Sequence, residues 1–112
     1  MLLAESELGR VVMTIGAIAA IVSRAVDESF GVVDRAGRRG PLRLLKRGRD
    51  GIRVKEADGG LALELHVVVD YGVNLGEVSA MVQSRVAYEV ERHTGLSVTA
   101  VDVHVDSARR AE

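Results

Sequence analysis

The sequence predicts an α+β fold: a two-layer sandwich in which two helices cover one face of a small mixed or antiparallel sheet. Three observations support this. The 112-residue chain is long enough for one hydrophobic core. Two segments repeat apolar residues at three- and four-residue steps, whereas others alternate apolar and polar residues. Only Phe30, Tyr71 and Tyr88 are aromatic, so aliphatic residues must build the core. We expect the order β-α-β-β-β-α-β in a single domain, residues 1–112, with its core at about 9–106.

The first helix is expected at about residues 15–29, after a short strand at 10–13. The Thr14 hydroxyl can accept from the free N–H groups at the helix start. Gly31 can end the helix in the left-handed conformation. The side chains expected to share the buried face are Ile15, Ile18, Ala19, Val22, Ala25, Val26 and Ser29.

The sheet is expected to continue with a brief strand at 31–34 and a hairpin at 52–70. Residues 52–56 alternate, Asp58-Gly59-Gly60 is a turn signal, and residues 61–70 alternate over a longer run. Helices should cover only one face of that long strand, and the other should face water. The covered face carries Leu61, Leu63, Leu65, Val67 and Val69, and the wet face carries Ala62, Glu64, His66, Val68 and Asp70.

The second helix should begin after Asn74, because Asn74 and Glu77 have the spacing of a capping box. Gly95 should end it. Its expected buried residues are Val78, Met81, Val82, Val86 and Val90. The last strand, residues 96–105, changes phase between Val98 and Val101, which predicts a β-bulge near Thr99 and Ala100.

Composition excludes several classes of protein. Without cysteine the chain can form no disulfide and no thiolate site, and a reducing cytoplasm is compatible with it. The first ten residues are acidic where a secretory signal is basic. The nearly uncharged run at 11–23 is shorter than the roughly 20 residues of a membrane span. We therefore expect a cytoplasmic protein that neither is exported nor crosses the membrane.

The charge of the chain is unevenly distributed. Residues 35–55 hold nine of the fifteen Lys and Arg residues and only one acid, a local charge of +8 against −9 elsewhere. Such a segment can contact phosphate or carboxylate groups. Pro41 suits the first turn of a short helical segment within it. The candidate contacts to an anionic surface are Arg38, Arg39, Arg43, Lys46, Arg47 and Arg49.

This basic segment admits three interpretations: a solvated loop, a nucleic-acid contact, or a contact to anionic lipid or acidic protein. Gly37-Arg38-Arg39-Gly40 matches the GXXG loop of KH domains, but it follows a strand rather than joining two helices. No aromatic residue lies between Phe30 and Tyr71, so the segment has no stacking platform for bases. These facts disfavour nucleic acid and favour an accessory contact to acidic protein or lipid headgroups.

Histidines offer the one candidate for a metal or acid–base site. Asp102, His104 and Asp106 alternate on one face of the last strand, and His66 would lie beside them if the two long strands pair. Ligand clusters usually join several elements in a concave site, so we favour a solvent-facing polar surface. His93 should complement the dipole of the second helix. No nucleophile motif or phosphate loop is present, so we expect no enzyme activity, no catalytic residue, no metal, no cofactor and no small-molecule substrate.

The whole pattern, over about residues 9–106, resembles the alkaline shock protein family, the envelope stress response proteins of Gram-positive and related bacteria. The similar segments are Gly51-Ile52-Arg53-Val54, the run from Leu65 to Leu75 with Tyr71-Gly72-Val73-Asn74, residues 82–86, and Thr94-Gly95-Leu96 leading into residues 101–105. Gly76 departs from the family, which often has proline there.

The resemblance implies a non-enzymatic scaffold or interaction module in envelope homeostasis. It also implies self-association and recruitment to the inner face of the membrane by an integral membrane partner. The family has no assigned site residues, so the resemblance identifies none in this chain. An independent reason to expect a homo-oligomer is that Val68 on the wet face, Val98 or Ala100 on the last strand, and uncovered sheet edges offer places for another copy to dock. The alternative function is a nucleic-acid-binding module that uses residues 35–55.

Overall fold

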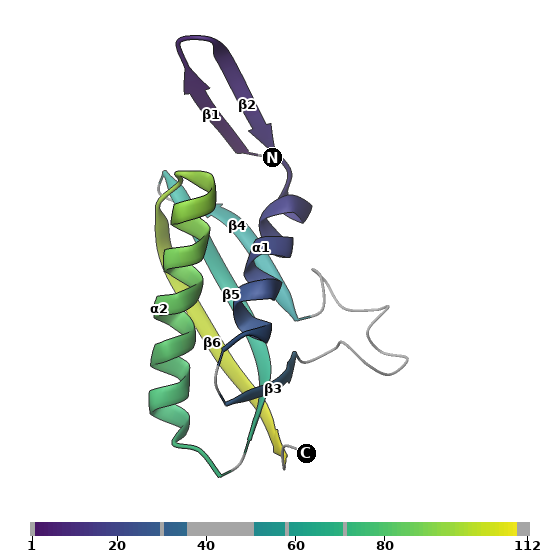
Figure 1. The fold of residues 1–112 in the computed structure, drawn as a ribbon. Helices are drawn as coiled ribbons and strands as arrows, with labels where there is room; N and C mark the ends of the chain where they lie inside the picture. The colour runs from purple at the N-terminus through teal and green to yellow at the C-terminus, as the bar shows by residue number, and fades with distance from the viewer. Residues whose placement is uncertain (1, 30, 36–50, 58, 71, 110–112) are drawn as a thin grey trace.

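The computed structural model of the protein describes residues 2–29, 31–35, 51–57, 59–70 and 72–109. Within these ranges two helices, α1 and α2, lie on one face of a mixed sheet, which confirms the predicted two-layer α+β class (Figure 1). The elements are β1 (Leu2–Ser6), β2 (Gly9–Met13), α1 (Ile15–Asp27), β3 (Val32–Arg35), β4 (Ile52–Ala57), β5 (Gly60–Asp70), α2 (Leu75–Thr94) and β6 (Val98–Arg109).

The long strand β5 is the centre of the sheet. It pairs antiparallel with β4 over Gly60 to Leu65 and with β3 over Val67 to Val69. On its other edge it pairs parallel with β6 along almost its whole length. Since β6 occupies that edge, β3 and β4 follow one another along the opposite edge. The parallel pairing requires a crossover, and α2 supplies it.

The core lies between the helices and the covered face of β5. As predicted, Leu61, Leu63, Leu65, Val67 and Val69 are all buried. Val101, Val103 and Val105 of β6 pack against the same core and are partly buried. The helices complete the core with Ile18, Ala19, Val22, Ala25 and Val26 from α1 and Val78, Val82, Val86 and Val90 from α2.

Two predicted core positions are wrong. Ile15 is 43% exposed because it is the first residue of α1, at the end of the helix rather than over the sheet. Met81 is 46% exposed, because the buried valines of α2 recur at exact steps of four and Met81 lies beside that line. The other predicted core residues of the two helices are buried.

The predicted helix signals act as expected at three of four ends. The Thr14 Oγ1 accepts from the Ala17 N–H at 3.1 Å, and the Asn74 Oδ1 accepts from the Glu77 N–H at 2.9 Å. Gly95 caps α2 in the left-handed conformation, with φ +75°. The first helix ends earlier than predicted, at Asp27 with Glu28 as its C-cap in the right-handed region, so Gly31 does not cap it.

The N-terminal hairpin was predicted only in part. The strand expected at 10–13 is β2, but it pairs with β1, which the sequence did not indicate. The hairpin stands away from the sheet and helices (Figure 1). Leu8 at its turn is fully exposed, and Val11 and Val12 are about half exposed.

Two irregularities interrupt the pairing of β6 with β5. The register shifts at Thr99, which confirms the predicted bulge, and again at Asp106, which the sequence did not indicate. The basic residues 36–50, including the predicted helical turn, lie outside the described residues.

Candidate functional site

A cluster of polar side chains occupies the sheet face that the helices leave uncovered. It arises because alternate residues of β5 point away from the core, and Glu64 and His66 are two of them. The parallel register places Asp102 opposite Glu64 and His104 opposite His66. The sequence predicted that His66 lies beside the last strand if the two long strands pair. They do pair, so His66 lies there.

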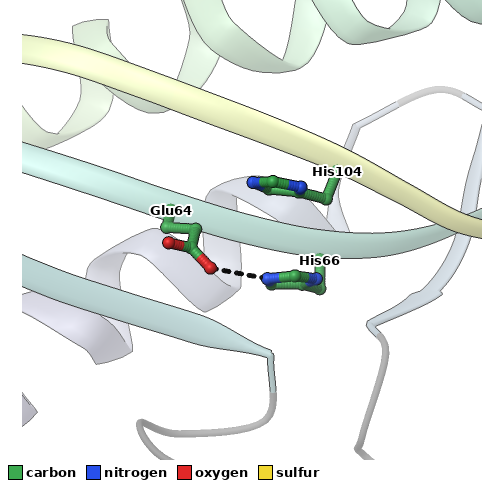
Figure 2. A group of neighbouring side chains, drawn as sticks. All are labelled: Glu64, His66 and His104. Carbon is green, nitrogen blue, oxygen red and sulfur yellow. Dashed lines mark hydrogen bonds and ion pairs between the residues drawn. The ribbon is translucent and has the colours of Figure 1, made fainter.

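Glu64, His66 and His104 converge (Figure 2). The two imidazole rings are stacked, with centroids 4.5 Å apart and an interplanar angle of 9°. The Glu64 Oε2 lies 2.7 Å from the His66 Nε2. Each of the three side chains offers one ligand atom, and these atoms all lie within 4.8 Å of one another.

Asp106 reaches the cluster because of the second bulge in β6. The register passes from Val105 opposite Val67 to Ser107 opposite Val68, so Asp106 has no partner residue on β5. Bulges commonly redirect a side chain in this way. Both Asp106 carboxylate oxygens lie 3.1 Å from the His66 Nδ1. His66 therefore has a carboxylate at each ring nitrogen.

This arrangement perturbs two pKa values. The hydrogen bond from His66, helped by the charges of His66, Arg53 and His104, lowers the pKa of the Glu64 carboxyl against the effect of burial. Partial burial by itself favours neutral His66, but the hydrogen bonds and charges of Glu64 and Asp106 outweigh it and raise the pKa of His66. In the imidazolium form, both ring N–H groups of His66 can donate to the carboxylates.

Most residues of this cluster could be predicted from the sequence. The alternation of the two strands predicts that His66, His104 and Asp106 lie together, but it places Glu64 only on the wet face. Asp102, which was grouped with them, is outside the set of three converging ligands. Glu64 could have been found from the same alternation, because it precedes His66 by two positions on one strand.

The third histidine lies elsewhere. His93 is in the last turn of α2, where its Nε2 is 3.4 Å from the Glu89 Oε2. This is the position predicted for it, where a positively charged ring interacts favourably with the negative end of the helix dipole.

A groove of about 920 Å³ runs beside α2 on the helix layer. The Arg85 guanidinium and the Glu28 carboxylate form an ion pair of 3.1 Å that joins the two helices there. The exposed Met81 and Tyr88 supply apolar surface to the groove. Its lining residues are Glu28, Ser29, Glu77, Ala80, Met81, Ser84, Arg85 and Tyr88.

The outer edge of β6 is the third surface feature. Among the described strands β6 pairs only with β5, so its other edge faces away from the sheet. Side chains of α2 cover the beginning of that edge: the Glu91 Oε2 accepts from the Val98 N–H at 2.9 Å, and the Gln83 Nε2 donates to the Val101 carbonyl at 2.9 Å. Since successive residues of a strand alternate, the N–H and C=O groups of Val103 and Val105 point outward like the Val101 carbonyl.

The basic residues predicted to contact an anionic surface all fall within 36–50, outside the described residues. Within the described ranges, neither helix combines the length and apolar character needed to cross a bilayer.

The chain is similar to a known protein family and to curated bacterial proteins. The model of the alkaline shock protein 23 family, described as having a cell envelope-related function, matches residues 4–109. Uncharacterized protein Spy1614 of Streptococcus pyogenes is 33% identical over 98 residues, which cover 82% of this chain and 81% of that protein. Uncharacterized protein YloU of Bacillus subtilis is 24% identical over 111 residues, covering 94% and 92%.

Several solved structures of the MamM CTD are similar in fold. One superimposes with a TM-score of 0.52 over 84% of this chain and 98% of that chain, at 13% sequence identity. Another gives a TM-score of 0.50 over 87% and 99%. At this identity the similarity concerns the fold alone.

Proposed function

The chain belongs to the alkaline shock protein 23 family, which has a cell envelope-related function. On this premise we propose that it is a non-enzymatic interaction module of the envelope. In this proposal it self-associates in the cytoplasm and is brought to the inner face of the membrane by an integral membrane protein. Residues 1–112 act as one domain.

The observation that carries the proposal is the free outer edge of β6. An uncovered strand edge presents N–H and C=O groups that can pair with another strand. Here α2 covers the edge near Val98 and Val101, whereas no described element pairs with it at Val103 and Val105. The second half of β6 therefore has outward backbone groups available to a partner.

A second copy of the chain is the partner that fits this edge. A strand can pair antiparallel with its own copy about a two-fold axis, because each N–H then meets a C=O of the same segment. Such pairing would join two sheets into one and leave the helix layer and its groove accessible. The groove with Met81 and Tyr88 offers apolar surface to a membrane-anchored partner.

Self-association is tested by the oligomeric state of two variants at one position. Val103→Pro removes the outward N–H of Val103, and Val103→Ala shortens the side chain but keeps that N–H. We expect dimers for the wild type and the alanine variant in light scattering, and a folded monomer for the proline variant. A wild-type monomer at high concentration would refute self-association.

Membrane recruitment is tested separately in cells. We expect a fluorescent fusion to follow the membrane, and crosslinking to capture an integral membrane protein. Reversing the charges of Arg38, Arg39, Arg43, Lys46, Arg47 and Arg49 should weaken membrane association only partly, since the basic segment is an accessory contact in this proposal. A fusion that stays uniformly in the cytoplasm would refute recruitment.

The charge distribution of the sequence motivates one alternative, nucleic-acid binding through residues 35–55. Such binding would weaken steeply as salt rises and would be lost in the charge-reversed variant. The same variant therefore separates the two functions, because self-association along β6 does not use these residues.

A further inference from the structure

We propose that Glu64, His66 and His104 form a binding site for one divalent transition cation of the zinc class on the open face of the sheet. The site lies on β5 and β6, and the ligands come from strands that are distant in sequence. It departs from the expectation of a plain solvent-facing surface, because the structure brings the three side chains together.

The donor set suits zinc and its neighbours in the first transition row. Imidazole nitrogen and carboxylate oxygen bind Zn²⁺ at about 2.0–2.2 Å, so two donors on one ion stand about 3.3 Å apart. The Glu64 Oε2 and the His66 Nε2, at 2.7 Å, need to separate slightly. The three ligand atoms lie within 4.8 Å of one another, and the exposed His104 ring, which now stacks on His66, must turn for all three to reach one ion.

Asp106 gives His66 the orientation of a metal ligand. Histidines that bind metals usually donate their other ring N–H to a carboxylate, which fixes the tautomer. The Asp106 carboxylate lies at the His66 Nδ1, so the Nε2 faces Glu64. A cation would take the place of the proton between the His66 Nε2 and the Glu64 Oε2, and that proton would leave to solvent.

The surrounding charge also favours a cation. Asp102 lies opposite Glu64 on β6, and Arg53 lies opposite Glu64 on β4. The carboxylates of Glu64, Asp102 and Asp106 therefore lie on the same sheet face of β5 and β6 as the two histidines. The charged residues of β4, β5 and β6 that the strand register places on this sheet face are Arg53 and Lys55 of β4, Glu64 and Asp70 of β5, and Asp102, Asp106 and Arg109 of β6.

Three protein ligands leave at least one coordination position, which here opens to solvent and would hold water. The ion would also tie β5 to β6 directly. If only the folded chain binds the ion, zinc would raise the melting temperature, and the rise would continue as the free zinc concentration exceeds the Kd.

Isothermal titration of the tag-free full chain with zinc chloride tests the site. We expect one Zn²⁺ per chain in the wild type. Asp106→Asn should weaken binding about 10–100-fold, the range for loss of such a supporting carboxylate. His66→Ala and His104→Ala remove ligands and should weaken binding more than that. The matched control is His93→Ala, since His93 is also exposed and next to a carboxylate, Glu89, and it should bind as the wild type does.

NMR of the histidine ring resonances in the wild type is a second measurement of zinc binding, and it needs no variant. Zinc should shift the resonances of His66 and His104 and leave those of His93 in place, with the His66 Nδ1 still protonated. Absence of stoichiometric binding in the wild type would overturn the proposal. Binding that survives in the folded His66→Ala/His104→Ala double variant would overturn it too.

Discussion

Gly60 is the position at which one methyl group should disturb the pairing of β5 with β6. A Cβ at Gly60 would lie 2.5 Å from the Ser97 carbonyl oxygen and 2.9 Å from the Thr99 Cγ2. The same carbonyl accepts from the Leu61 N–H at 2.8 Å. Gly60→Ala must therefore push the start of β6 away from β5 by about 1 Å to restore ordinary contact, and this displacement would break the hydrogen bond.

The cost of Gly60→Ala follows from these two effects. Overpacking costs about 1–3 kcal/mol, and the lost hydrogen bond costs about 1 kcal/mol. We expect a loss of roughly 2–4 kcal/mol in the free energy of unfolding. For a chain of 112 residues, this corresponds to a fall of roughly 9–17 °C in melting temperature.

Thermal and urea unfolding followed by circular dichroism measure this loss. The control is Gly59→Ala in the same turn, where a Cβ would meet nothing within 4 Å and only the positive φ of +79° opposes alanine. That control should cost about 1 kcal/mol. If Gly60→Ala is no more destabilising than Gly59→Ala, the close approach of β6 to Gly60 is not what the structure indicates.

Three further predictions concern the open face, a helix cap and the core. In metal-free protein, NMR titration should place the pKa of His66 above the ordinary 6.5, and Glu64→Gln should lower it. Since the folded-state pKa is raised, the stabilisation from His66 is complete below the unfolded-state pKa and is lost as pH rises through the folded-state pKa; a His66 pKa below 6.5 would contradict the geometry. Asn74→Ala should cost about 1 kcal/mol in chemical denaturation, because the Glu77 N–H loses its acceptor, and an unchanged midpoint would argue against the cap. Leu65→Ala should cost about 2–5 kcal/mol in the same assay, because Leu65 is fully buried at the centre of β5; a cost under about 1 kcal/mol would mean that this face is not the core.

Features set by neighbouring residues could be predicted from the sequence. The alternation of residues 61–69 identified the buried face of β5, and Asn74 and Gly95 marked both ends of α2. Each of these signals depends on strand or helix geometry within a few residues. The change of phase before Val101 likewise located the first bulge of β6.

Features set by contacts distant in sequence could be predicted only partly. Helical spacing predicted Met81 as a core residue, but α2 contacts the sheet through its buried valines and leaves Met81 exposed. The strand β1 is stabilised by its pairing with β2, and its own residues carry little signal. The bulge at Asp106 follows from the pairing of β6 with β5, so the carboxylate at the His66 Nδ1 became visible only in three dimensions.

Amide hydrogen exchange along β6 tests the central claim, pairing of a second copy with the free edge, most directly. The outward N–H groups of Val103 and Val105 should exchange rapidly in dilute solution and become protected as protein concentration rises. The N–H groups of Asp102 and His104 point toward β5 by alternation and should be protected throughout. Rapid exchange of Val103 and Val105 at every concentration would contradict the claim.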